Sequence, residues 1–268
     1  MSPADENVRM LTETSGMEQT RDPRLQRHLP PSASFGWLGQ GWRDLVTNPV
    51  SSLAYGLAVF LVSIVLIWTM VALNLDYVLF PVIAGFMIVG PLLAVGLYAK
   101  SRAIEEGRRI SLGQMIVVPV KSGQQIIFTG LLLSLLLLVW LRAAVLIYAL
   151  FFGYRPFPGI DNIAPMLFTT PTGWAMLVVG TFVGGLFAAL GFGLSAFSVP
   201  MLLNERTDAV TAMATSIKLI WNNFRVMITW GIIVLALFLV SVATGMLALI
   251  IVFPLLGHAT WHAYRAIR

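Results

Sequence analysis

The sequence predicts an all-α integral membrane protein: a polytopic bundle of six transmembrane helices, arranged as three hairpins with short cytoplasmic interfacial amphipathic helices. Two observations carry this prediction. Hydrophobic residues make up 58% of the 268 residues and charged residues only 11%, whereas a soluble domain carries about 25% charged residues. The few charges also leave long uncharged stretches between them, each long enough to cross a bilayer. We therefore expect a lipid bilayer to surround most of the chain.

Five weakly charged stretches hold the six predicted spans. Apart from Arg142, His258 and His262, no Asp, Glu, Lys, Arg or His lies in residues 45–75, 77–99, 122–154, 162–204 and 226–264. A spanning helix needs about 20 residues, so the last stretch is long enough for two helices joined by a tight turn. The predicted spans are residues 50–73, 77–99, 125–151, 174–202, 226–243 and 246–264.

The N-terminal residues differ in composition from the rest. Residues 1–34 are rich in Pro, Ser, Glu and Arg and contain no long apolar run. Such a segment buries too little surface to offset its ordering entropy, and it lacks the apolar region of a signal peptide. We expect a disordered cytoplasmic tail over residues 1–34 and a membrane domain over residues 35–268.

The basic residues predict the orientation. All of the 17 Lys and Arg residues except Arg142 and Arg155 lie before the first span, in the second and fourth loops, or after the last span. The positive-inside rule then places both termini in the cytoplasm, which agrees with an even number of spans. The net charge of +5 is explained by this topology, so nucleic acid is not an expected partner.

A short amphipathic segment precedes each predicted hairpin. Residues 207–224 carry apolar residues at steps of three and four, and residues 37–45 and 112–116 show the same pattern more weakly. Ser111 and Gln114 have the spacing of a capping box. Trp beside Lys and Arg in such segments suits the headgroup layer of a membrane.

Proline repeats in the even-numbered spans. Pro91, Pro200 and Pro254 lie in their cytoplasmic halves, where proline favours a kink. Together with the amphipathic segments this predicts three repeated units of interfacial helix plus hairpin. The alternative is coincidence, since interfacial Trp and membrane Pro are common.

Arg142 is the one charge inside a predicted span, and an intramembrane charge is a functional candidate by default. It lies about ten residues from the outer end of its helix, within reach of the interface by snorkelling. Asp76 and Asp161 lie on the same side and are candidate partners. Two roles stay open: an anchor that sets the depth of the helix, or an anion- or substrate-binding residue.

Two further patterns are weaker candidates. His258 and His262 are four residues apart and share a helix face, which suits one metal ion or a haem. The ordinary explanation is an interfacial belt of Trp, Tyr and His. Gly180, Gly184 and Ala188 form a small-residue ridge that allows close helix packing, within the bundle or between copies.

The residues that several kinds of catalytic or binding site require are absent from the sequence. The sequence has no Cys, no acidic residue in any predicted span, and no phosphate-binding loop, Gly-x-Ser-x-Gly or His-Glu-x-x-His motif. Glu105, Glu106, Glu205 and Asp208 are interpreted as solvated loop charges. We expect no cofactor and a non-enzymatic scaffold or accessory subunit, whose partners are lipid and another membrane protein or a second copy. The alternatives are a small permease or channel with Arg142 near the path, and haem or metal binding at His258 and His262.

Several segments resemble a known family. They are Trp42–Leu45, Asn48–Pro49, Gly90–Tyr98, Phe168–Pro171 and Pro254–Tyr264. They are similar to a bacterial family of predicted integral membrane proteins catalogued as a domain of unknown function, over about residues 30–266. The resemblance implies six spans and a bacterial inner membrane, and supplies no activity. Some members are labelled cytochrome c oxidase subunit I, but three histidines are too few for a haem–copper core.

Overall fold

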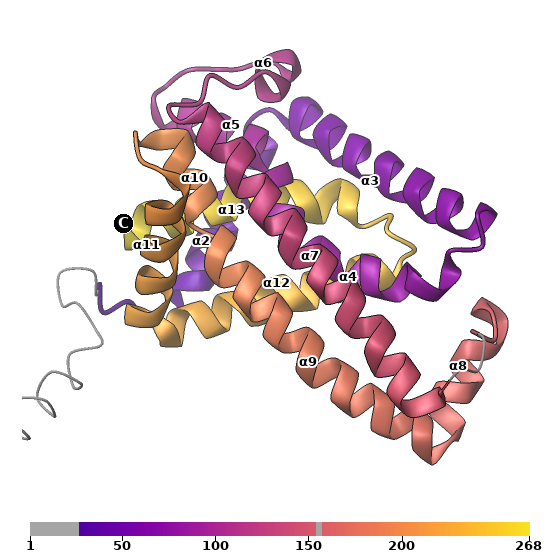
Figure 1. Cartoon of the computed structure of the whole chain (residues 1–268). Helices are drawn as coiled ribbons and strands as arrows, with labels where there is room; N and C mark the ends of the chain where they lie inside the picture. The colour runs from indigo at the N-terminus through magenta and orange to yellow at the C-terminus, as the bar shows by residue number, and fades with distance from the viewer. Residues whose placement is uncertain (1–26, 154–156) are drawn as a thin grey trace, which may run out of the picture.

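The computed structural model describes residues 27–153 and 157–268, and all regular structure there is helical (Figure 1). This confirms the all-α class. The elements are α2 (Ala33–Thr47), α3 (Pro49–Ala72), η2 (Asp76–Val78), α4 (Leu79–Leu93), α5 (Val95–Glu105), α6 (Leu112–Ile116), α7 (Gly123–Phe152), α8 (Ile160–Thr169), α9 (Pro171–Ser195), α10 (Ser198–Asn204), α11 (Ala209–Asn222), α12 (Phe224–Ala243) and α13 (Leu249–Ile267).

Five helical segments are long and apolar enough to cross a membrane. They are Pro49–Ala72, Leu79–Glu105, Gly123–Phe152, Pro171–Asn204 and Phe224–Ala243. They coincide with the first five predicted spans, which confirms a polytopic membrane protein. The sixth predicted span corresponds to α13, which is not one of the five, because its second half carries His258, His262 and Arg265. The count of six spans stays a prediction.

The second and fourth of these segments each break next to a proline. Helix α4 ends at Leu93, shortly after Pro91, and α5 begins at Val95. The break between α9 and α10 includes Ala196, whose carbonyl would accept the N–H that Pro200 lacks. Pro254, by contrast, lies inside a continuous α13.

The three predicted amphipathic segments are the helices α2, α6 and α11. The capping box is present: Ser111 N donates to Gln114 Oε1 at 2.8 Å, and Gln114 N donates to Ser111 Oγ at 3.4 Å. Helix α2 is more deeply placed than an interfacial helix needs to be, because it packs against α13 and buries Trp37 and Leu45.

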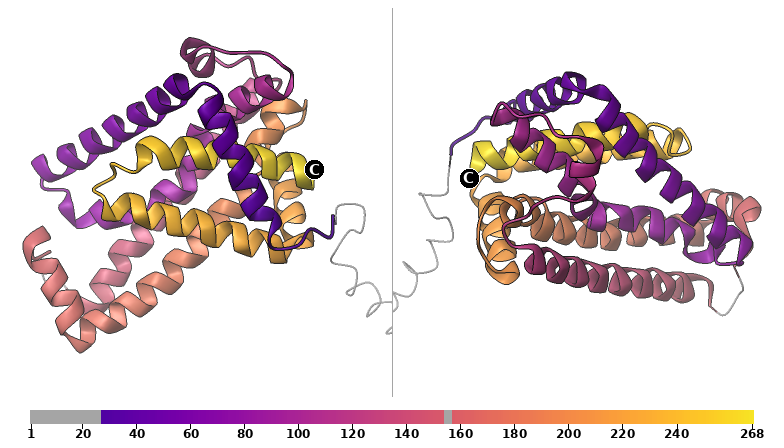
Figure 2. Two further views of the ribbon diagram at one scale, coloured as in Figure 1. Left: turned by 180° about the vertical axis from the view of Figure 1, so that it is seen from behind. Right: turned by 90° about the horizontal axis from the view of Figure 1, so that it is seen from above.

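The helices converge at one end of the molecule. There lie α2, α10, α11 and the C-terminus, with the exposed Lys218, Arg225 and Arg265; we call this the basic end (Figures 1 and 2). Toward the opposite end, α7–α9 separate from α3, α12 and α13. Helix α4 lies between the two groups, because it packs against α7 and α9 and its Phe86 stacks on Phe238 of α12.

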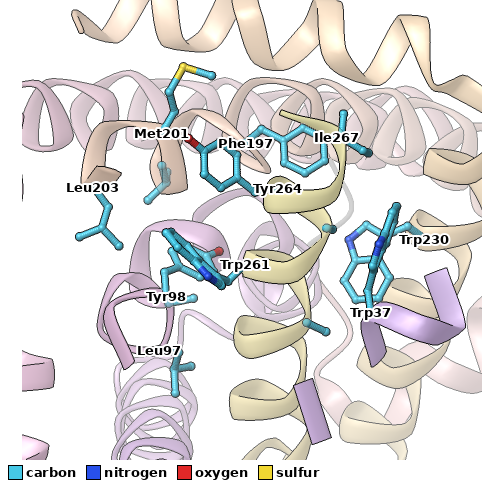
Figure 3. Packing of buried hydrophobic residues seen from close by; sticks show 14 of the residues in the cluster. Trp37, Leu97, Tyr98, Phe197, Met201, Leu203, Trp230, Trp261, Tyr264 and Ile267 are labelled. Carbon is cyan, nitrogen blue, oxygen red and sulfur yellow. The ribbon is translucent and has the colours of Figure 1, made fainter. Parts of the chain in front are cut away.

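The main hydrophobic core fills the basic end around α13. Tyr98 of α5, Phe197 just before α10, and Trp261 and Tyr264 of α13 are buried there. Trp37 of α2 meets Trp230 of α12 edge to face (Figure 3). Three glycines let neighbours approach α13 closely: Gly41 faces Ala259, Gly56 faces Pro254, and Gly257 faces Leu97. Helix α13 is therefore the central element of this end.

The described residues begin at Arg27, inside the segment predicted as a tail. From Arg27 on, the chain packs against the end of α13: Arg27 Nη2 donates to the carbonyl of Arg268 at 2.8 Å, and Nε donates to that of Ile267 at 3.3 Å. A cation at a helix C-terminus is electrostatically favourable. The rest of the predicted tail, residues 1–26, lies outside the described residues.

Candidate functional site

A polar cluster is buried at the basic end, with His258 of α13 at its centre. The imidazole is fully buried; its Nδ1 lies 2.8 Å from Ser101 Oγ and its Nε2 lies 2.8 Å from Ser52 Oγ. A neutral imidazole offers one donor and one acceptor, and a hydroxyl can complement either. Both ring nitrogens are thus satisfied by helices α5 and α3.

Lys100 brings a cation into the same cluster. Its side chain lies on α5, and the residue is only 2% exposed. Nζ donates to Ser52 Oγ and to the carbonyl of Asn48, both at 2.7 Å. Asn48 immediately precedes α3, so one ammonium group ties the start of α3 to the middle of α5. A buried cation persists only when it is paired with such partners.

Asp44 of α2 and His262 of α13 extend the cluster toward the surface. Asp44 Oδ2 lies 2.8 Å from His262 Nε2, and Glu105 Oε1 lies 3.8 Å from His262 Nδ1. Burial alone would raise the pKa of the Asp44 carboxyl, but its hydrogen bonds with His262 and Ser101 outweigh burial and hold the pKa below its ordinary value. The cluster therefore runs continuously through α2, α3, α5 and α13.

Asp44 gives the fold a testable pH dependence. Because its pKa is lowered on folding, its contribution to stability is complete at neutral pH and is lost as the pH falls through the folded pKa, below the ordinary value of 3.8. We expect the difference in melting temperature between the wild type and Asp44→Asn in detergent to be largest near neutral pH and to shrink as the pH falls below 3.8. An undiminished difference at pH 3 would contradict this.

The two histidines have separate partners. His258 is bound by serines and His262 by carboxylates. Within the described residues no group of three His, Cys, Asp or Glu side chains is placed to hold a metal ion. Haem or metal binding at this pair stays a prediction.

Arg142 lies on an exposed face of α7. Its neighbours Trp140 and Ala144 are buried on another face of the helix. The side chains of Asp76 and Asp161, its predicted partners, are outside the described part of the structure. Arg142 does not line the groove described next, and a place near a permease path stays a prediction.

An apolar groove of about 1100 Å³ runs along the bundle between α9 and α12. Helices α4 and α7 also line it, through residues such as Ile88 and Trp140. At the basic end it begins at Trp221 and Phe224, and at the other end it reaches Tyr77 and Phe168. No charged residue lines it within the described chain. The groove thus extends over most of the length of the spans.

The small-residue ridge of α9 lies on this groove. Gly180, Gly184 and Ala188 all line it. A β-carbon on Gly184 would meet the ring of Trp140 at 2.9 Å, whereas Gly180, and Gly231 of α12, have no neighbouring atom within 4 Å of that position. The predicted helix-packing role therefore suits Gly184, and Gly180 faces open space.

A smaller cleft of about 480 Å³ adjoins the groove at the basic end. His28, Asn223 and Arg225 contribute polar groups to it, and Phe224 lines both hollows. Leu29 and Val226 also line this cleft, so at Phe224 the surface changes from almost wholly apolar to a mixture of polar and apolar groups that includes the cation Arg225.

All four acidic residues interpreted as solvated loop charges have defined partners. The Glu205 carboxylate accepts hydrogen bonds from Tyr264 Oη at 2.6 Å and Arg268 Nη2 at 3.0 Å. Burial opposes ionisation, but these bonds keep the pKa of Glu205 below its ordinary value. Glu105 faces His262 and Arg265. Asp208 caps α11 by accepting from Thr211 N, and Glu106 pairs with Arg108 in solvent.

Sequence reasoning missed the buried roles of Asp44, Ser52, Lys100 and Ser101. Lys100 and Asp44 were interpretable only as flanking charges, because their partners are far away in sequence. One signal existed: the segments Trp42–Leu45, Asn48–Pro49 and Pro254–Tyr264, which carry the family resemblance, all contribute to this cluster.

The family resemblance is confirmed over residues 79–204, a shorter range than the predicted residues 30–266. No curated protein and no solved structure matches the chain. Residues 79–204, from α4 to α10, match the model of a family described as predicted integral membrane protein (DUF2189), a domain of unknown function.

Proposed function

We propose that this integral membrane protein is a non-enzymatic accessory or scaffold component that holds an elongated apolar partner in the groove between α9 and α12. The groove itself carries the proposal. Lipid tails are as apolar as the side chains of a span, so shape rather than hydrophobicity distinguishes a binding surface in a bilayer. A concave surface offers an elongated partner more contacts than a convex one.

Two features support this use of the groove. Gly180 and Gly231 face open space from opposite walls, which permits close approach to the backbone of both helices. The buried polar cluster, in contrast, has its groups engaged with one another and fixes the helices at the basic end. By the positive-inside rule we place that end in the cytoplasm of a bacterial cell.

Site-specific photocrosslinking tests the proposal. A benzophenone amino acid replaces either Leu235, on the wall of the groove, or Leu61, on α3 outside it; the two side chains are similarly exposed, at 44% and 52%. Irradiation in native membranes is expected to give a discrete adduct at position 235 and only diffuse labelling at position 61. Mass spectrometry of the adduct identifies the partner as lipid or protein. Indistinguishable labelling at both positions would sink the proposal.

A further inference from the structure

We propose that the half of the groove nearest the basic end is a binding site for an anionic glycerophospholipid, with its headgroup at Lys218 and Arg225. This inference rests on the proposed function and names the partner. Three observations carry it: the junction of the two hollows, the charges around that junction, and the length of the apolar surface.

The junction has the polarity of an amphiphile. On one side of Phe224 the groove is lined by carbon-rich side chains such as Ile217, Ile220 and Ile228. On the other side the cleft is lined by polar groups, those of His28 and Arg225 among them, together with Leu29 and Val226. A ligand that lies across Phe224 must therefore be apolar at one end and polar at the other, as a phospholipid is and the apolar middle of a transmembrane helix is not.

The charge at the junction is positive. Arg225 lines the cleft. Lys218 lines neither hollow, but it lies on α11 three and four residues before Trp221, which lines the groove, and Asn222, which lines the cleft, so it shares their helix face. Both cations are exposed. In the described ranges, neither cation has a carboxylate within ion-pair distance, and neither hollow has an acidic lining residue. Basic pockets between transmembrane helices are typical binding sites for anionic headgroups. The described walls of the two hollows supply no negative charge to complement these cations. An anionic headgroup on the ligand would supply it.

The apolar surface matches one leaflet. The hydrocarbon core is about 30 Å thick, so acyl chains from one side reach about 15 Å, or about ten residues of helix. Along α12 this distance runs from Phe224 past Gly231, where the space in front of the backbone is open. Trp221 and Phe224 then lie at the headgroup level, where aromatic residues are enriched in membrane proteins.

Lipid binding to the purified full chain tests this site. Detergent-solubilised protein is titrated with phosphatidylglycerol or with phosphatidylcholine of the same acyl chains, and bound lipid is counted by native mass spectrometry. The wild type is expected to retain phosphatidylglycerol more strongly. Each basic residue near the headgroup contributes about a fivefold gain, so the double variant Lys218→Gln/Arg225→Gln should bind phosphatidylglycerol about 25-fold more weakly and phosphatidylcholine unchanged. Arg43→Gln is the matched control, because Arg43 of α2 is an exposed cation that lines neither hollow.

A second variant separates this inference from the proposed function. Gly231→Trp fills the open space on α12 and is expected to reduce binding of both lipids, whereas Leu61→Trp on α3 leaves binding unchanged. If both lipids were retained equally and only Gly231→Trp reduced their binding, the anionic preference would be overturned. The groove would still be a binding surface. The lipid assignment would also be overturned if Gly231→Trp displaced a second copy of the chain, or another protein, and left lipid binding unchanged. If Gly231→Trp changed neither lipid binding nor protein binding, both proposals would be overturned.

Discussion

Replacement of Gly41 with leucine is expected to destabilise the protein by about 3 kcal/mol or more, near the upper end of the range for overpacked cores. Gly41 is buried on α2 where this helix crosses α13. A β-carbon there would lie 2.6 Å from the backbone nitrogen of Ala259 and 2.8 Å from its Cβ. The backbone of α13 cannot yield locally, because its neighbours α3 and α5 also hold it at close range. Helix α2 must therefore move away.

Thermal unfolding in detergent, followed by tryptophan fluorescence, measures this effect. Displacement of α2 separates Trp37 from Trp230, whose ring centroids are 6.0 Å apart, so the folded spectrum should change as well as the midpoint. Gly36→Leu is the matched control, because Gly36 lies on the same helix with no atom within 4 Å of its β position. Equal midpoints for the two variants would show that α2 does not pack against α13 in solution.

The sequence predicted the elements of this fold better than their arrangement. Uncharged stretches mark the spans because a charge in hydrocarbon is costly, and this cost depends on local sequence alone. The capping box of Ser111 and Gln114 is equally local, and both features are present in the structure. The groove, in contrast, depends on how far α9 and α12 separate, which no spacing within either helix reveals.

Lys100 shows why the polar cluster could not be predicted. A lysine at the end of an apolar stretch is ordinarily a solvated flanking charge, and it contributed to the orientation argument on that basis. Here α5 continues to Glu105, and Asn48 and Ser52 supply acceptors from about 50 residues earlier. Burial of a cation depends on such distant partners, so only the tertiary structure identifies it. The same holds for Asp44 and His262, which are paired across 218 positions.

Substitution of Lys100 with methionine is expected to cost about 3–5 kcal/mol, the range for removal of one partner from a buried charged network. Methionine fills the volume but leaves the carbonyl of Asn48 and the hydroxyl of Ser52 without their donor. It also removes the cation that offsets the negative charge of Asp44. We expect a large fall in the melting temperature of the detergent-solubilised protein.

A double-mutant cycle shows whether the cluster acts as a unit. Asp44 and Lys100 are connected through Ser101, His258 and Ser52. Once Lys100→Met has broken this network, Asp44→Asn has less left to disrupt, so we expect a coupling energy of about 1 kcal/mol or more between them. Asp44→Asn combined with Glu205→Gln is the matched control, because Glu205 belongs to the separate group with Tyr264 and Arg268. If the changes in unfolding free energy were additive in both pairs, Asp44 and Lys100 would stabilise the helices independently. The hydrogen bonds between them would then provide no energetic coupling.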